Sequence, residues 1–146
     1  MIDVDTIMGC RPCTAWPRDR VASVVTGAMS LVDVMECSAI PTPDRGWVWA
    51  HLSGTDIAPL AARIASTAMR RCPPHRAAQA DAALARWHAD QIPLCRDRGE
   101  VAHHFRAVLR DAAYVAAWAV ADGGDEWDLA REAEHSRQIK ILLETL

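Results

Sequence analysis

Apolar residues recur at helical spacing along nearly the whole chain, and this periodicity limits the possible fold more than any other feature of the sequence. Alternation of apolar and polar residues, the pattern of a half-buried strand, occurs only over residues 2–7. The chain is also rich in alanine, the strongest helix former. These features predict an all-α fold in which the helices pack into one compact bundle.

Prolines and glycines divide this pattern into about six to seven helices, after an irregular N-terminal segment of residues 1–16. The expected helices cover residues 17–27, 31–37, 44–52, 55–72, a segment from 74 to the loop at 93–99, 100–121 and 125–146. No linker is long enough to separate domains. We therefore expect residues 1–146 to form a single helical domain.

Polar residues at the expected helix starts predict how some of these helices are capped. Ser30 with Asp33 three residues later resembles a capping box. Thr55 is the expected N-cap of the most clearly amphipathic helix. Asp125, with Asp128 at the third helical position, is the expected N-cap of the last helix.

In the helix after Pro73-Pro74, four apolar residues fall on one face and predict its buried side: Ala77, Ala80, Leu84 and Trp87. The charged residues Arg76, Asp81 and Arg86 are then expected to face solvent.

Gly123-Gly124 joins the two long helices at the end of the chain, and this short break predicts an antiparallel αα-hairpin. The pairing places Leu109 near residues 137–139 and Tyr114 opposite Glu132. Alanines on both facing sides allow a close approach of the two helices.

Length and composition are those of a globular protein, with 146 residues, 51% hydrophobic and 24% charged. The longest stretch without a charge or histidine, residues 21–32, is shorter than the roughly 20 residues that span a bilayer. The acidic N-terminus lacks the features of a secretory signal. Five cysteines, an odd number, are expected to be reduced. We therefore expect a cytoplasmic protein without a membrane helix.

Charge is distributed unevenly along the chain. The net charge is −3, yet residues 63–110 contain nine basic against four acidic side chains, and both flanking segments are acidic. The basic segment could bind nucleic acid through five arginines: Arg63, Arg70, Arg71, Arg76 and Arg86. Abundant arginine is also what a high-GC genome encodes, so the segment alone does not establish such a function.

Cys10 and Cys13 form a Cys-x-x-Cys motif that suits redox chemistry or zinc binding. The thioredoxin-like context of a preceding strand and a following helix is missing. A zinc site needs further ligands that only the fold could bring close: Cys37, Cys72, Cys95, His75, His103 or His104. We expect instead that the motif forms a turn packed against the bundle, with no metal or cofactor bound.

Glu100-x-x-His103 and Glu132-x-x-His135 match the repeated motif of di-iron helical bundles. The expected hairpin separates them, because Glu132 pairs with Tyr114, which lies about 20 Å along its helix from Glu100. No nucleophile with a base, phosphate-binding loop or catalytic carboxylate pair is evident. The sequence therefore predicts no catalytic residues and a protein that is not an enzyme.

Trp47 and Trp49 lie two positions apart on one expected short helix, so their side chains diverge by about 200°. Both can hardly enter the same core. We therefore expect one of them to be exposed, beside Arg45, as Trp and Arg are the residues that dominate protein interfaces.

Asp44-Arg45-x-Trp47, the alanine-rich helices with Asp111-Ala112-Ala113 and Ala116-Ala117-Trp118, and the closing Gln138-x-x-x-Leu142-Leu143-x-x-Leu146 together resemble the alanine-rich immunity proteins of bacterial toxin systems. The resemblance covers residues 40–146. It implies a small binding protein that neutralises another protein without chemistry of its own.

The sequence thus favours a non-enzymatic inhibitor that occludes a protein partner. Its expected partner-binding residues are Arg45, Trp47, Trp49, Arg70, Arg71 and Arg76. The alternatives are a phage-type, anti-CRISPR-like inhibitor of a bacterial defence complex, a nucleic-acid binder through residues 63–110, and a small zinc or redox protein through Cys10 and Cys13.

Overall fold

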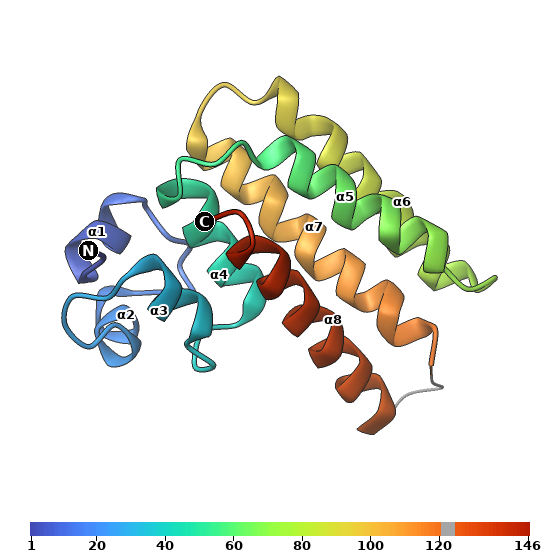
Figure 1. The fold of residues 1–146 in the computed structure, drawn as a ribbon, viewed down its shortest axis with the longest axis horizontal. Helices are drawn as coiled ribbons and strands as arrows, with labels where there is room; N and C mark the ends of the chain where they lie inside the picture. Colours follow the sequence, from blue (N-terminus) through green and yellow to red (C-terminus); the bar gives the residue numbers. More distant parts are fainter. Residues whose placement is uncertain (121–124) are drawn as a thin grey trace.

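The computed structural model describes residues 1–120 and 125–146, and within them eight α-helices pack together without a named strand, which confirms the all-α bundle (Figure 1). The helices are α1 (Val4–Gly9), α2 (Arg18–Val24), α3 (Leu31–Glu36), α4 (Thr42–Leu52), α5 (Ile57–Arg71), α6 (Arg76–Gln91), α7 (Arg98–Trp118) and α8 (Asp125–Leu143), with a short 3-10 turn, η1 (Ile92–Leu94), before α7. Across these residues, none of the helices is both long and apolar enough to cross a bilayer.

Helix α7 is the centre of the bundle, because α4, α5, α6 and α8 all pack against it (Figure 1). Its buried side is mostly alanine and valine around Phe105 and Leu109, which are fully buried. Small side chains let neighbouring helices approach closely. Helix α4 lies close against α7 at Gly46, where an added Cβ would be 2.0 Å from Leu109 Cδ1.

The N-terminal segment is more regular than expected, because residues 1–16 contain helix α1. Asp3 caps this helix by accepting a hydrogen bond from the backbone N–H of Thr6 at 2.8 Å. Ile2 pairs with Met29 in an isolated antiparallel bridge. These local contacts arrange α1 and α2 beside α3 and α4 (Figure 1).

Helix starts follow the expected caps in part. The capping box of Ser30 and Asp33 is confirmed, with both of its reciprocal hydrogen bonds present. Asp56, not Thr55, caps α5, because its carboxylate reaches the N–H of Ala58. The expected break at Gly123-Gly124 lies outside the described residues, and α8 begins at Asp125 itself.

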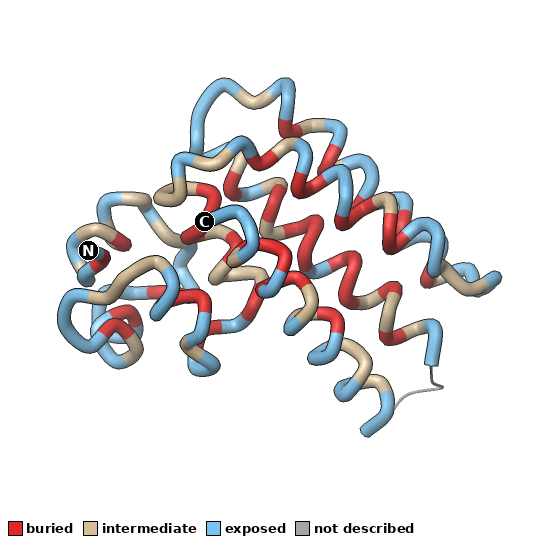
Figure 2. Tube along the Cα trace, viewed as in Figure 1, coloured by how far each residue is buried: buried red, intermediate tan, exposed pale blue. Residues whose placement is uncertain are grey.

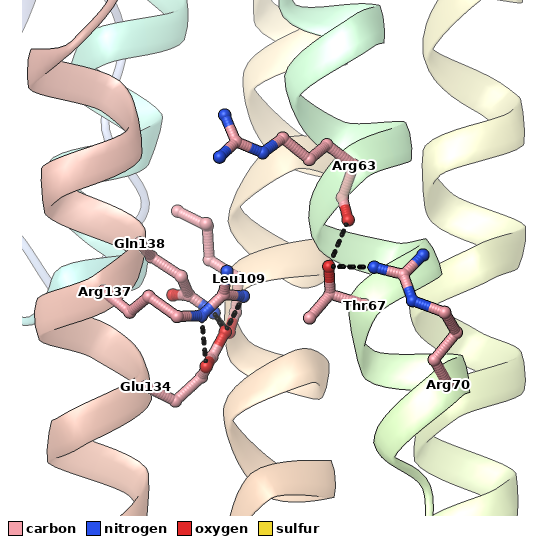
Figure 3. A network of polar contacts seen from close by, with 7 residues as sticks. All are labelled: Arg63, Thr67, Arg70, Leu109, Glu134, Arg137 and Gln138. Carbon is pink, nitrogen blue, oxygen red and sulfur yellow. Dashed lines mark hydrogen bonds and ion pairs between the residues drawn. The ribbon is translucent and has the colours of Figure 1, made fainter.

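The expected antiparallel packing of the last two long helices is confirmed. Gln138, fully buried on α8, donates its side-chain N–H to the carbonyl oxygen of Leu109 on α7 at 3.1 Å (Figure 3). Glu134, one turn earlier, accepts from Gln138 at 3.2 Å and from Arg137 at 2.7 Å. The register is therefore the one that the sequence predicts, with Leu109 level with residues 137–139.

The expected buried face of α6 is wrong. Its buried residues are Ala78, Ala82, Ala85 and Ala89, whereas Leu84 and Trp87 are exposed. Buried and exposed positions alternate along this helix in Figure 2. Both stripes have helical spacing, so periodicity alone could not separate them. The alanine stripe is buried because it allows α6 to lie close against α5 and α7.

Candidate protein-interaction surface

The expectation that Trp47 or Trp49 is exposed is wrong. Trp49 is fully buried, and Trp47 is half-buried and packs against the core. The Trp47 ring also meets the His51 ring edge-on, with 4.4 Å between their centroids. The two tryptophan side chains point to different faces of α4, yet both are shielded from solvent because α7 and α3 pack against this helix.

Arg45 is also part of the fold. It donates to the backbone carbonyl oxygen of Met35 on α3 and, at 2.7 Å, to the hydroxyl of Thr42. Burial lowers the pKa of the Arg45 guanidinium from its usual value. Its main contacts therefore join α3 to α4, although the side chain also reaches a cavity described below.

Asp44 connects three separate parts of the chain. Its carboxylate accepts a hydrogen bond from the Trp16 indole N–H at 3.0 Å and pairs with Arg106 of α7 at 2.5 Å. The motif Asp44-Arg45-x-Trp47 thus stabilises this fold through internal contacts.

A small cavity of about 100 Å³ lies between the N-terminal helices, α4 and α7. Its walls are mainly apolar and include Trp16 and Trp47, with Cys13 and His103 among the few polar groups. Sites for small organic ligands usually measure about 300–1,000 Å³. The cavity is thus a packing defect of modest size beside Trp47.

Cys10 and Cys13 form no disulfide with each other. All five cysteines are free, with Cys10 half-buried and Cys13 exposed. Burial raises the pKa of the Cys10 thiol, which disfavours the thiolate needed for redox chemistry or zinc binding. Among residues 1–120 and 125–146, no three His, Cys, Asp or Glu side chains are grouped to hold a metal ion.

The two Glu-x-x-His motifs occupy separate places, as the hairpin geometry predicts. His103 lines the small apolar cavity near the N-terminal helices. His135 lines a different cavity, between α4, α7 and α8. The two motifs therefore share no common site.

The most exposed aromatic anchor described is Trp87 on α6, with 52% of its surface exposed. Leu84, three residues earlier and so adjacent on the same helix face, is 46% exposed. Met69 on α5 is 44% exposed and accepts from the Arg86 guanidinium at 3.7 Å. We call the exposed side chains of the α5–α6 hairpin the α5–α6 surface, and Arg63 points to the other side of α5 from Arg70 (Figure 3). The residues that define this surface are Arg63, Met69, Arg70, Arg71, Arg76, Leu84, Arg86 and Trp87.

Arginines give the α5–α6 surface a positive charge. Arg70, Arg71 and Arg76 lie near the turn of the hairpin, where α5 ends and α6 begins, and all three are exposed. Arg63 lies two turns before Arg70 on α5 (Figure 3). Arg70 donates to the neutral hydroxyl of Thr67 at 3.0 Å and forms no ion pair within the described residues (Figure 3).

The carboxylates of the hairpin do little to offset these charges. Asp90 pairs with Arg86 at 3.1 Å. Asp81 faces α7 and accepts a hydrogen bond from the Trp118 indole N–H at 2.9 Å. Burial, and secondarily the charge of Asp111, raises the pKa of Asp81, whose carboxylate faces the interior of the bundle and not the arginines of the hairpin. The hairpin is therefore a basic surface with exposed apolar side chains.

Two histidines beside Trp87 connect α6 to α7. His88 on α6 and His104 on α7 meet with 2.9 Å between their Nδ1 atoms. The Trp87 ring meets each of them edge-on, at centroid distances of 4.9 and 5.7 Å. Burial lowers the pKa of both histidines, so at neutral pH one neutral ring can donate to the other. This contact gives Trp87 a fixed support on the bundle.

The sequence predicts part of this surface. Arg70, Arg71 and Arg76 are exposed, as a partner-binding role requires, but Arg45, Trp47 and Trp49 serve the fold. Trp87 was missed because it was assigned to the buried face. The signal that could have found it is the unbroken alanine stripe from Ala78 to Ala89, which leaves Trp87 on the opposite side.

No family model, curated protein or solved structure matches this chain. The resemblance to alanine-rich immunity proteins therefore remains an expectation.

Proposed function

We propose that this chain is a non-enzymatic, immunity-like inhibitor that binds an acidic protein partner through the α5–α6 surface and occludes it. The observation that carries the proposal is Trp87, half exposed next to Leu84 on a hairpin where Arg70, Arg71 and Arg76 form no ion pair within the described residues. Water contact with large apolar groups is unfavourable, and burial in an interface removes it.

The residue types on this surface match those that dominate protein interfaces. Trp and Arg are the residues most enriched among binding hot spots, usually inside a ring of less important contacts. Trp87 would enter a pocket of the partner, and the arginines would pair with carboxylates around it. Complementary charge also speeds association and selects against basic partners.

Inhibition by occlusion agrees with the absence of a recognised catalytic arrangement in the sequence. The inhibited partner would be a cytoplasmic toxin, as the resemblance implies, or a bacterial defence complex in the alternative form of the proposal. Both forms share one physical requirement, an acidic patch that the α5–α6 surface covers.

Nucleic-acid binding is the second candidate, since Arg63, Arg70, Arg71 and Arg76 could contact phosphates. The exposed Leu84 and Trp87 favour a protein, because an aliphatic side chain gains little from a phosphate backbone. The two candidates differ in what Leu84 contributes to binding.

The experiment is affinity capture from a bacterial lysate treated with nuclease, followed by affinity measurement with the captured protein. Trp87→Ala should weaken binding by about 2 kcal/mol or more, as hot-spot substitutions do. Leu129→Ala on α8 is the matched control, because Leu129 is 65% exposed and lies outside the hairpin. Its affinity should equal that of the unchanged chain.

Two results would contradict the proposal. One is equal loss of binding in Trp87→Ala and Leu129→Ala, which would place the interface elsewhere. The other is capture that disappears after nuclease treatment, together with a steep salt dependence that Leu84→Ala leaves unchanged, which would support nucleic acid.

A further inference from the structure

A second, larger cavity of about 560 Å³ opens between the start of α4, helix α7 and helix α8. It lies on the side of α7 that α8 covers, whereas α6 covers another side (Figure 1). Its size falls within the range of small-molecule sites, about 300–1,000 Å³. The side chains that matter for its chemistry are Arg45, Arg110, Tyr114, Arg131, His135 and Ser136.

Helical spacing brings these side chains to one opening. Arg110 and Tyr114 are four residues apart on α7, and Arg131 and His135 are four residues apart on α8, so each pair lies on one helix face. The antiparallel register of the two helices sets Arg110 level with Ser136. Arg45 enters from the first turn of α4, on a third side of the cavity.

The three guanidinium groups keep donors that no protein group uses within the described residues. Arg110 bonds to Asp111 at 2.9 Å through Nε, and neither of its terminal nitrogens has a hydrogen-bond partner there. Arg131 contacts Asp128 at 3.2 Å through one terminal nitrogen. The Nε of Arg45 is buried without a partner, and so is the Nε2 of His135. Buried polar atoms without partners are rare, and a bound ligand is one way to satisfy them.

The charge around the cavity favours an anion. Glu132 is the one carboxylate among the residues that line it, against three arginines. Asp111 and Asp128, which do not line the cavity, pair with Arg110 and Arg131, so the arginines face the cavity with their remaining donors. 

The pKa of His135 reflects the charges around the cavity. Its pKa is lowered to about 4, first by burial and then by the positive charges of Arg131 and Arg45, while Glu134 acts in the opposite direction. An anion bound beside this ring would raise the pKa, since it would favour the protonated imidazole.

We propose that this cavity binds the phosphate group of a small molecule. Three guanidinium groups on three sides match the three terminal oxygens of a phosphate better than the two oxygens of a carboxylate. The hydroxyl groups of Tyr114 and Ser136 add donors on α7 and α8. The volume exceeds that of a bare phosphate ion, so the group would be carried by a phosphomonoester. This site is independent of the α5–α6 surface.

The test measures the pKa of His135 by NMR of its ring protons, with inorganic phosphate, phosphoserine or adenosine monophosphate, and with sodium chloride at equal ionic strength. Each phosphate probe should raise the His135 pKa by about one unit, equivalent to about tenfold tighter binding to the protonated protein. Chloride should leave it nearly unchanged.

Arg131→Gln is the informative variant, because its partner Asp128 is 60% exposed and does not become a buried unpaired charge. It should weaken phosphate binding about tenfold, the typical effect of losing one charge-assisted hydrogen bond. Arg63→Gln, an exposed arginine on α5 outside the cavity, is the matched control and should bind as the unchanged chain does. Circular dichroism checks that both variants are folded.

Tighter binding of a phosphomonoester than of inorganic phosphate supports the proposal in full. Tightest binding of inorganic phosphate supports the phosphate site and assigns free phosphate as the ligand. The proposal is overturned if phosphate shifts the His135 pKa no more than chloride does, or if Arg131→Gln and Arg63→Gln weaken binding equally.

Discussion

Gly46→Ala tests how tightly α4 packs against the central helix. The new methyl carbon would lie 2.0 Å from Leu109 Cδ1 and 3.6 Å from Phe105 Cε1. Carbon atoms in contact prefer about 3.5–4.0 Å, so Leu109 or the whole of α4 must move by about 1.5 Å. Leu109 is fully buried, so its displaced side chain must move against other core residues.

The expected magnitude follows from two opposing effects. Overpacking a core costs about 1–3 kcal/mol, and this severe overlap belongs at the upper end of that range. Alanine is a better helix former than glycine by about 1 kcal/mol, which offsets part of the cost. Gly46→Ala should therefore lower the free energy of unfolding by about 2 kcal/mol.

Chemical denaturation measures this change, and Gly9→Ala is the control. Gly9 is also helical, at the end of α1, but an added Cβ there meets no atom within 4 Å. That substitution should leave stability unchanged or raise it slightly. The double variant Gly46→Ala/Leu109→Ala should lose less unfolding free energy than the sum of the losses in the two single variants. The reason is that Leu109→Ala removes the atom with which the new methyl group clashes. An unfolding free energy for Gly46→Ala equal to that of the unchanged chain would refute the reasoning.

Three further predictions follow from burial. Trp49→Ala should destabilise the protein by about 3–5 kcal/mol, whereas Trp87→Ala should leave the thermal midpoint nearly unchanged, a contrast that calorimetry measures. Stability should fall as pH drops from about 6.5 toward 4, because His135 is protonated there in the unfolded chain but stays neutral in the folded protein to about pH 4. Chemical denaturation at a series of pH values measures this loss, and His135→Gln should make the dependence on pH less steep. An unchanged slope in that variant would count against the prediction. A chelator with a reductant should not shift the thermal midpoint, since Cys10 and Cys13 are free thiols; unfolding on their addition would instead identify these residues as metal ligands.

The features that sequence predicts well here depend on local rules. The capping box of Ser30 and Asp33 needs only residues three apart, and the register of Leu109 against Gln138 follows from two long helices and a short break. Several helices begin one or two residues away from the position that the sequence predicts. Helix α5, for example, is capped by Asp56 and not by Thr55.

The features that sequence did not predict depend on contacts between distant segments. No local pattern predicts that Arg45 donates to the carbonyl oxygen of Met35, or that Trp49 is fully buried. The cavity around His135 also requires the pairing of α7 with α8 and the entry of α4, which join segments about 90 residues apart in the chain. Periodicity identifies a helix and its possible faces, but neighbouring helices decide which face is buried, as on α6.

The contacts of the Asp44 carboxylate also constrain the order in which the protein folds. The carboxylate holds Trp16, 28 residues before it, and Arg106, 62 residues after it. During synthesis α1 and α2 are made well before α7, which supplies Arg106 and most of the central packing. Until then Trp16 and the apolar residues of α1 and α2 have no completed bundle to pack on. These apolar residues would therefore be available to a chaperone until α7 has been made.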